Sequence, residues 1–286
     1  MKVIGVVPNL ERDKELFTTK KLIENLKKKN ISVYVSKQIA LCIQDEAIGL
    51  SEEELYKTCD VIIAIGGDGT ILSSAQNASL SGIPVLGINQ GRLGFLADIE
   101  IDAIDELIEK LLNRDYKIEE RMMLQTKVTQ PNGKEEIFYA VNDVTVTRGS
   151  FSRMEDFKIY ANNELVDVYP ADGILIATPT GSTAYNLSAG GPIVVPTAKA
   201  LIVTPICPHT IYSRSIIMSH LDVIYIKTCN YEGAMMQLCV DGKPKVDITP
   251  AHDIEVMKSP YILKLVKTSH LSFFEILRNK IVERRK

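Results

Sequence analysis

The chain has 286 residues, of which 45% are apolar and 24% are charged, a composition typical of globular proteins and a length sufficient for two domains. The formal net charge of −3 argues against a nucleic-acid partner, and the absence of about 18 consecutive apolar residues argues against a membrane span. The sequence opens on a strand pattern rather than a signal peptide, and its five cysteines are scattered, so we expect reduced thiols in a cytoplasmic protein. The four histidines have no metal-ligand spacing, which predicts no metal cage built by the protein alone.

The first part of the chain alternates strand and helix patterns. Short apolar or β-branched runs predict strands at residues 2–7, 31–35, 61–65 and 83–88. Amphipathic periodicity predicts helices at residues 14–29 and 102–113, and Ser51 followed by Glu54 has the pattern of a capping box. Runs such as "VIIAI" are apolar on both faces, as central parallel strands are when helices cover both sides. We therefore expect an α/β, Rossmann-like N-terminal domain over residues 1–118.

Beyond residue 118 the pattern changes to alternating polar and apolar positions. Turn signals at residues 132–133 ("NG") and 162–163 ("NN") separate strand-like runs, as they do in hairpins. The second domain, residues 119–267, is therefore predicted to be a mainly antiparallel β-sandwich. Residues 268–286 contain a helical pattern, and we expect this C-terminal helix to pack back on the N-terminal domain.

The segment "VIIAIGGDGTIL", residues 61–72, places an aspartate among glycines directly after a buried strand pattern. In an open α/β sheet, ligands bind outside the carboxyl ends of the strands, and glycines there let the backbone approach a ligand closely. Exposed N–H groups at the start of the following helix suit phosphate, which predicts a phosphate loop of Gly66, Gly67, Gly69 and Thr70. The alternative is a tight strand-to-helix turn with Asp68 as its N-cap, and the pattern alone leaves both interpretations open.

A second glycine-rich segment, "GINQGRLGFL" at residues 87–96, follows the next strand pattern. Because neighbouring parallel strands end at the same edge of a sheet, two glycine-rich loops with few side chains would form one crevice there. Two common nucleotide motifs are excluded. There is no Gly-x-x-x-x-Gly-Lys-[Ser/Thr], and Leu72 stands where Gly-x-Gly-x-x-Gly needs its third glycine. Any phosphate must therefore bind to a different kind of loop.

The β-rich part contains two polar stretches that lie between apolar ones. "VNDVTV" places Asn142 and Asp143 inside an apolar alternating run. A buried polar pair needs partners, so the pair is either structural or binds hydroxyl or amino groups of a ligand. Residues 178–185 concentrate Pro, Gly, Thr, Ser and Tyr. They form either a capped turn into a helix near Ser182 or the lining of a nucleotide pocket, with Tyr185 as an aromatic plate.

Together these segments resemble the NAD kinases of bacterial type over nearly the whole chain. The matching stretches are "GGDGTIL", "GINQGRLGFL", "VNDVTVTRG", "ADGILIATPTGSTAYNLSAGGPIV" and "TPICPHT". A Gly-Gly-Asp-Gly loop alone also occurs in diacylglycerol kinases and 6-phosphofructokinases, but its combination with Asn142-Asp143 and "TGSTAY" is highly specific. The resemblance implies phosphorylation of the 2′-hydroxyl of NAD's adenosine ribose, giving NADP, with ATP or polyphosphate as donor. It also implies a divalent metal ion, Mg²⁺, carried with the nucleotide phosphates, and a homodimer or homotetramer.

The resemblance also implies roles for individual residues. Asp68 would be the general base, and Asn142 and Asp143 would bind the adenine side of NAD. Asp172 would lie near the nicotinamide and reach it from a neighbouring subunit. The implied NAD contacts are Asp68, Gly69, Asn142, Asp143, Arg153, Asp172, Thr183, Ala184, Tyr185, Asn186, Ser188, Cys207 and His209.

Two positions depart from the family pattern. Relatives often have Asn-Glu where this chain has Asn142-Asp143, and the shorter carboxylate can accept the same hydrogen bonds after a small backbone shift. Many relatives have Gln after the late Asp-Gly, where this chain has Lys243, so we assign Lys243 no ligand contact.

A carboxylate among glycines has a chemical reason. A ribose hydroxyl is a poor nucleophile, and a positioned base that takes its proton typically contributes about 10²–10⁴-fold. Mg²⁺ on a triphosphate neutralises developing charge and needs no cage of protein ligands. Two rival functions are a lipid or sugar kinase, which would not need the loop at residues 180–185, and a silent dinucleotide-binding regulator, which the presence of Asp68 disfavours.

Overall fold

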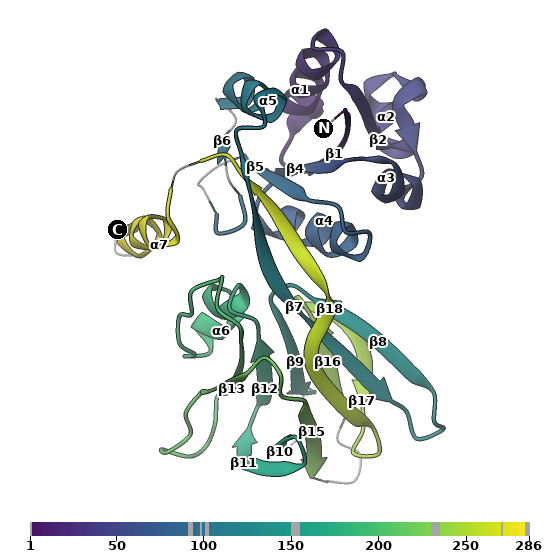
Figure 1. Cartoon of the computed structure of the whole chain (residues 1–286). Helices are drawn as coiled ribbons and strands as arrows, with labels where there is room; N and C mark the ends of the chain where they lie inside the picture. Colours follow the sequence, from purple (N-terminus) through teal and green to yellow (C-terminus); the bar gives the residue numbers. More distant parts are fainter. Residues whose placement is uncertain are drawn as a thin grey trace. The chain divides into compact units, whose positions relative to one another are not determined.

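The structure is a computed structural model that describes residues 2–90, 94–97, 99–100, 103–149, 155–229, 235–269 and 271–283. The chain divides into two compact units, Met1–Glu120 with Leu263–Lys286, and Arg121–Ile262. The chain passes from one unit to the other within two long strands, β7 (Lys117–Thr129) and β18 (Asp253–Lys267) (Figure 1). The second unit is therefore inserted between the two segments that make up the first.

The first unit is built on a parallel sheet. Its strands are β1 (Val3–Pro8), β2 (Ser32–Ser36), β3 (Gly49–Leu50), β4 (Val61–Gly66), β5 (Val85–Asn89) and β6 (Ile99–Glu100). Their order is β3-β2-β1-β4-β5, with β6 also paired to β5, and all of these pairs are parallel. The order reverses between β1 and β4, and ligands of open α/β sheets bind at such a point.

Helices cover both faces of this sheet (Figure 1). They are α1 (Phe17–Lys28), α2 (Lys37–Ile43), α3 (Glu52–Thr58), α4 (Asp68–Leu80) and α5 (Ile104–Asn113). On one face α1 and α5 are joined by a 2.6 Å hydrogen bond from Asn25 to Asp105, and on the other α3 and α4 are joined by a 3.0 Å bond from Asn77 to Glu52. Every residue of β4 is buried, which explains its uninterrupted apolar sequence.

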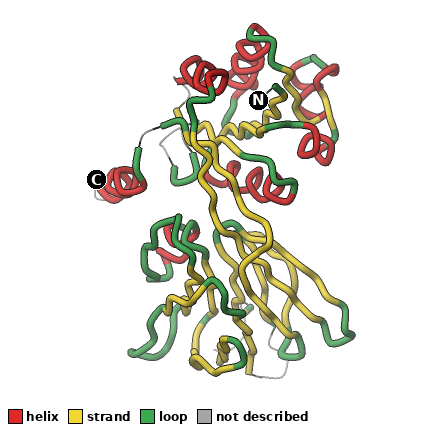
Figure 2. Tube along the Cα trace, viewed as in Figure 1, coloured by secondary structure: helices red, strands yellow, loops and turns green. Residues whose placement is uncertain are grey.

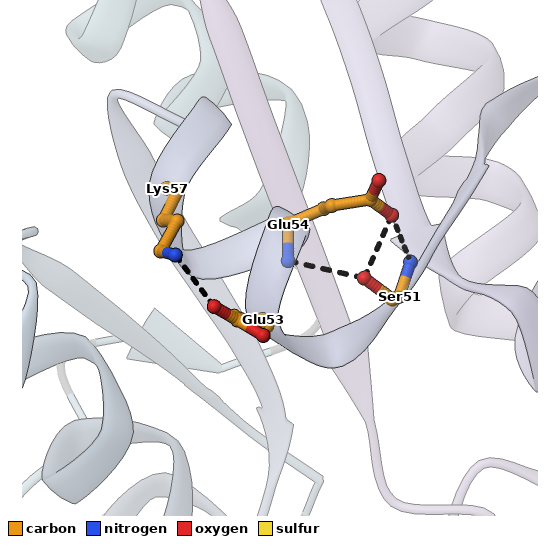
Figure 3. A network of polar contacts seen from close by, with 4 residues as sticks. All are labelled: Ser51, Glu53, Glu54 and Lys57. Atoms are coloured by element: carbon orange, nitrogen blue, oxygen red, sulfur yellow. Dashed lines mark hydrogen bonds and ion pairs between the residues drawn. The ribbon is translucent and has the colours of Figure 1, made fainter.

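The start of α3 confirms the predicted capping box. The Ser51 hydroxyl accepts a hydrogen bond from the Glu54 backbone N–H at 3.2 Å, and the Glu54 carboxylate accepts one from the Ser51 N–H at 2.9 Å (Figure 3). Glu53 and Lys57 form an ion pair on the exposed side of the same helix. These contacts satisfy backbone donors that the first turn of a helix leaves unpaired.

The second unit contains two antiparallel sheets, and Figure 2 shows strand as its dominant structure. Its remaining strands are β8 (Glu135–Ala140), β9 (Asp143–Arg148), β10 (Glu155–Ala161), β11 (Glu164–Ala171), β12 (Gly173–Ala177), β13 (Ala200–Ile206), β14 (Ile216–Ser219), β15 (Ile224–Cys229), β16 (Met236–Val240) and β17 (Lys243–Ile248). One sheet has the order β14-β13-β12-β9-β16-β17, and the other runs β11-β10-β15-β18, with β7 paired to both β18 and β8. Apolar side chains of both sheets, such as Phe157 and Ile174, share one core, which confirms the predicted antiparallel sandwich.

Turns of the second unit lie where the sequence signals predicted them. Gly133, between β7 and β8, has φ of 83°, and Asn162 and Asn163, between β10 and β11, have φ of 47° and 74°. A further turn of this kind, Asp241 (φ 49°) and Gly242 (φ 74°), joins β16 to β17. These left-handed conformations favour Gly, Asn and Asp, and they match the twist of a hairpin.

The last part of the chain belongs to the first unit. Leu265, near the end of β18, pairs in parallel with Val85 of β5. The helix α7 (Phe273–Glu283) follows, and the Phe273 ring centroid lies 6.0 Å from that of Phe95. Across the described parts of the chain, no helix is both long and apolar enough to cross a membrane.

Candidate functional site

In the first unit, the two glycine-rich loops meet at the Asp68 side chain. Gly67 is the N-cap of α4 and Asp68 is its first residue, but Asp68 does not cap this helix. Its carboxylate instead accepts hydrogen bonds from the backbone N–H groups of Phe95 and Leu96, both at 3.4 Å. The N-cap interpretation of Asp68 is therefore wrong, and the carboxylate lies between the two loops.

Glycine at position 94 makes this approach possible. A Cβ atom on Gly94 would overlap the Asp68 carboxylate, so the loop after β5 can lie against Asp68 only without a side chain there. Residues 91–93 of the same segment lie outside the described residues. Asp68 is half-buried and Gly69 is exposed beside it, so the carboxylate is positioned by backbone groups yet open to a ligand.

The loop after β1 completes this edge of the sheet. The Asn9 side-chain amide donates to the Thr70 hydroxyl at 2.7 Å, and the Asn9 backbone N–H donates to the Ile65 carbonyl at 2.8 Å. The Arg12 guanidinium lies against Gly67, with Nη1 2.6 Å from the position that a Cβ would take. A cation beside exposed loop N–H groups is an arrangement that binds phosphate.

In the second unit, Asn142 and Asp143 are held in place by a carboxylate from the turn between β16 and β17. Asp241 Oδ1 accepts from the backbone N–H groups of Asn142 at 2.7 Å and Asp143 at 3.2 Å, and Oδ2 accepts from Val141 at 2.9 Å. From the other side, Thr178 donates its backbone N–H to the Asn142 carbonyl at 2.8 Å and its hydroxyl to the Val141 carbonyl at 2.7 Å. We call these contacts the Asp241 clamp; they fix the backbone of residues 141–143 and leave the Asn142 side chain half-buried.

Burial and a nearby like charge keep the carboxyl of Asp143 protonated up to a pH well above the usual range for an aspartate. Burial raises the pKa of Asp143 to about 7, and the neighbouring Asp241 carboxylate adds to the rise. Burial also raises the pKa of Asp241, while the N–H groups of the Asp241 clamp oppose that rise. One proton in this buried pair avoids the repulsion of two adjacent carboxylates.

The loop at residues 178–191 is short and tightly hydrogen-bonded. A 3₁₀ turn, Gly181–Thr183, precedes the helix α6 (Tyr185–Ser188), so the predicted helix near residue 182 is divided in two. Asn186 is fully buried: its amide donates to the Ser182 and Pro192 carbonyls at 3.2 and 3.0 Å, and its oxygen accepts from Thr204 at 2.7 Å. The side chain of Asn186 therefore holds the loop together.

Other predicted NAD contacts on this loop differ in exposure. Thr183 is buried, Ala184 is half-buried, and Ser188 is exposed. Tyr185 is 45% exposed, so its ring can stack on a ligand. Burial raises the pKa of Tyr185, and the charges of Cys207, Asp143 and Asp172 add to the rise.

The remaining predicted residues flank β12 and β13. The Asp172 carboxylate accepts a 2.7 Å hydrogen bond from Arg148 Nε, an ion pair that the sequence did not predict. Cys207 is exposed in a left-handed conformation (φ 47°), and His209, also exposed, donates its backbone N–H to the Pro170 carbonyl at 2.8 Å. Arg153 lies outside the described residues.

Comparison with known proteins agrees with this geometry. Residues 4–116 match the family described as ATP-NAD kinase N-terminal domain, and residues 141–268 match ATP-NAD kinase C-terminal domain. The NAD kinase of Caldanaerobacter subterraneus subsp. tengcongensis is 43% identical over 284 residues, which cover 99% of this chain and 100% of that protein. The chain belongs to the NAD kinase family. It is thus an enzyme of this family, a kinase that binds NAD and phosphorylates it with ATP.

Solved structures of NAD kinases and NADH kinases have the same fold. Yeast NADH kinase, in complex with NADH, has a TM-score of 0.89 and 25% identity, with 98% of this chain and 87% of that chain covered. The NAD kinase of Archaeoglobus fulgidus, in complex with ATP, has a TM-score of 0.73 and 25% identity, with 99% and 98% covered. The kinase of Ruminiclostridium cellulolyticum, at 40% identity over 287 residues, is a further full-length relative.

Four residues of the candidate site were missed by the sequence prediction. Arg12 and Asn9 follow the first strand, where a polar "PNLER" stretch was the available signal. Asp241 occurs in an Asp-Gly turn signal, but its contact with residues 141–143 lies about a hundred residues away along the chain. Arg148 and Asp172 are brought together by the pairing of β9 with β12, which no local sequence pattern predicts.

Proposed function

We propose that Asp68 is the general base that activates the 2′-hydroxyl of NAD's adenosine ribose. The proton of that hydroxyl passes to the Asp68 carboxylate, and the oxygen forms a bond to the γ-phosphorus of ATP. The bond from that phosphorus to the oxygen bridging to the β-phosphate breaks, which leaves NADP and ADP. The observation that carries the proposal is the Asp68 carboxylate, held by the N–H groups of Phe95 and Leu96 at 3.4 Å and serving no helix cap.

Phosphate binding is proposed for the loop Gly66, Gly67, Gly69 and Thr70. Glycines leave the backbone N–H groups at the start of α4 accessible, and the positive end of the helix dipole favours an anion there. The Arg12 guanidinium against Gly67 adds a full positive charge. These groups bind and orient the donor phosphates close to Asp68.

Recognition of NAD is proposed for the second unit. Asn142 and Asp143 bind the adenine side, and the protonated carboxyl of Asp143 can donate as well as accept a hydrogen bond. The exposed ring of Tyr185 is proposed to stack on NAD. The other residues that stay predicted NAD contacts are Thr183, Ala184, Asn186, Ser188, Cys207 and His209. Arg153 and Asp172 are proposed to line the same site, with Asp172 serving a neighbouring subunit in a homodimer or homotetramer.

Mg²⁺ is proposed to enter with the phosphates of ATP. Within the described ranges no group of three or more His, Cys, Asp or Glu side chains is arranged to hold a metal ion. The half-buried Asp68 carboxylate beside the phosphate loop fits an ion that takes most of its ligands from phosphate and water. When bound, Mg²⁺ neutralises charge that develops on the phosphates.

A cytoplasmic location also stays a proposal. Cys42, Cys59, Cys207 and Cys239 are free thiols, which supports a reducing compartment.

Incubation of the purified protein with NAD, ATP and Mg²⁺ tests the function, with NADP as the measured product. Asp68→Asn keeps the shape of the side chain but removes the base, so kcat should fall by roughly 10²-fold or more while the Kd for NAD changes little. Asp105→Asn, in the first turn of α5, is the matched control because it removes an acidic side chain from a comparable helix position. Near-normal kcat in Asp68→Asn would remove Asp68 from catalysis.

A further inference from the structure

The helix α7 brings an aromatic ring from the end of the chain to the loop that binds Asp68. The ring of Phe273, the first residue of α7, lies against that of Phe95, with centroids 6.0 Å apart and planes at 42° (α7 is yellow in Figure 1). Both side chains are half-buried, and aromatic pairs attract at centroid separations of about 4.5–7 Å. The backbone N–H of the same Phe95 donates to the Asp68 carboxylate at 3.4 Å. Phe95 therefore links Phe273, through its ring, to Asp68, through its backbone.

The hydrogen bonds to Asp68 depend on where this loop lies. The N–H groups of Phe95 and Leu96 are both 3.4 Å from the carboxylate oxygens, at the long end of the range for such bonds, so a small displacement breaks them. On one side the buried Leu96 and Ala97 anchor the loop. On the other side Gly94 has no side chain, because a Cβ there would overlap the carboxylate. The ring of Phe95 is thus an anchor that Gly94 itself cannot supply.

The start of α7 is itself held in place. The Glu275 backbone N–H donates to the Ser272 hydroxyl at 3.3 Å, and the Ser272 N–H donates to the Glu275 carboxylate at 2.8 Å, which forms a capping box. Ile276, one turn into the helix, is buried, and α7 belongs to the same compact unit as Asp68. Phe273 lies between this cap and this anchor, so its ring is a fixed support for that of Phe95.

We propose that Phe273 is a positioning residue for phosphoryl transfer, which acts through Phe95 to keep the loop N–H groups on the Asp68 carboxylate. The proposal rests on the function proposed above, in which Asp68 takes the proton of the ribose hydroxyl. A carboxylate held by two N–H groups meets that hydroxyl in one orientation, and a misplacement of about 1 Å can cost about 10²-fold in rate. The last helix of the chain therefore contributes to the chemical step without touching a substrate.

Phe273→Ala removes the ring and tests the proposal. We expect kcat for NADP formation to fall about tenfold, while the Kd for NAD and the Kd for ATP change less than about twofold, because the residues proposed to bind the substrates are unaltered. Phe273→Tyr keeps the ring and should recover most of kcat. Phe274→Ala is the matched control, because it removes the same side chain from the next position of α7, where the ring is 55% exposed and contacts that of Phe273 at 5.5 Å. Its kcat should stay within about twofold of the wild type.

Combination with Asp68→Asn separates positioning from a general loosening of the fold. Once the base is removed, its position no longer matters, so Phe273→Ala should lower the residual kcat less than about twofold. A purely structural effect would lower kcat by the same factor in both backgrounds, and that result would overturn the proposal. Unchanged kcat in folded Phe273→Ala, or an equal loss in Phe274→Ala, would overturn it as well.

Phe273→Leu keeps apolar bulk without a ring and takes the place of Phe273→Ala should that variant not fold. Its kcat should fall at least about threefold, and a wild-type value would count against the proposal. The two proposals fail in different ways. Near-normal kcat in Asp68→Asn alone would refute the proposed general base and the positioning role with it. A large loss in Asp68→Asn beside normal kcat in Phe273→Ala would refute only the positioning role.

Discussion

Replacing Asp241 with asparagine tests whether the Asp241 clamp serves NAD binding. Asp241→Asn keeps the size of the side chain and its left-handed backbone (φ 49°), which asparagine also adopts readily. It changes one of the two acceptor oxygens into an amide donor. If the remaining oxygen keeps the Asn142 and Asp143 bonds of 2.7 and 3.2 Å, the new NH₂ group faces the Val141 N–H, whose 2.9 Å bond is lost.

The size of the effect follows from these bonds. Hydrogen bonds to a charged group contribute about 1.5–3 kcal/mol, and here one is lost and two become neutral. We expect the free energy of unfolding to fall by about 2–4 kcal/mol, reduced somewhat because Asp143 no longer faces a second carboxylate. Since the freed segment carries Asn142 and Asp143, KM for NAD should rise about tenfold, which corresponds to about 1.4 kcal/mol of binding free energy.

Steady-state kinetics and urea unfolding measure the two effects. KM for ATP should change by less than about twofold, because the clamp lies wholly in the second unit. Asp247→Asn, at an exposed position of β17, is the matched control and should behave like the wild type. The reasoning is refuted if Asp241→Asn keeps both the wild-type KM for NAD and the wild-type urea midpoint; lower stability with an unchanged KM would mean that the clamp serves only the fold.

Further predictions concern Gly94, Asp143 and Asp172. Gly94→Ala puts a methyl group where the Asp68 carboxylate lies, so kcat should fall about 10–100-fold with little change in thermal stability, and less than additively with Asp68→Asn. Because the native Asp143 holds a proton up to a pKa of about 7, and the unfolded chain releases it near the ordinary value of 3.8, the free energy of unfolding should decline as pH rises between these values. Asp143→Asn should flatten that decline in urea titrations, and an unchanged slope would contradict the assignment. A mixed oligomer of Asp68→Asn and Asp172→Ala subunits, isolated by two tags, should regain activity if Asp172 completes a neighbour's site; activity no higher than that of either parent would mean that each site is built within one chain.

Features that depend only on residues close together in the sequence were predicted correctly. The burial of β4, the capping box at Ser51 and Glu54, and the turn at Gly133 each depend on a few adjacent residues, and each lies where the sequence placed it. The meeting of the two glycine-rich loops was also predictable, because parallel strands end at one edge.

Long-range contacts were not predictable in this way. Asp241 and Val141 are brought together only by the pairing of β16 with β9, and no local pattern encodes that pairing. The role of Asp68 could not be separated from helix capping until the Phe95 and Leu96 N–H groups were seen to bind it. A turn signal predicts a turn, but it does not say which distant backbone the turn residue will contact.

The insertion of the second unit into the first has a consequence for synthesis on the ribosome. β5 is complete long before Leu265 is made, and Leu265 is the residue that pairs with Val85 along its edge. At about 5–20 residues per second, the part of the β5 edge at Val85 waits about 10–40 s for its partner strand β18, which also completes the sandwich. A chain truncated after Ile262 should therefore contain a protease-resistant second unit attached to an N-terminal sheet whose β5 edge is unpaired at Val85.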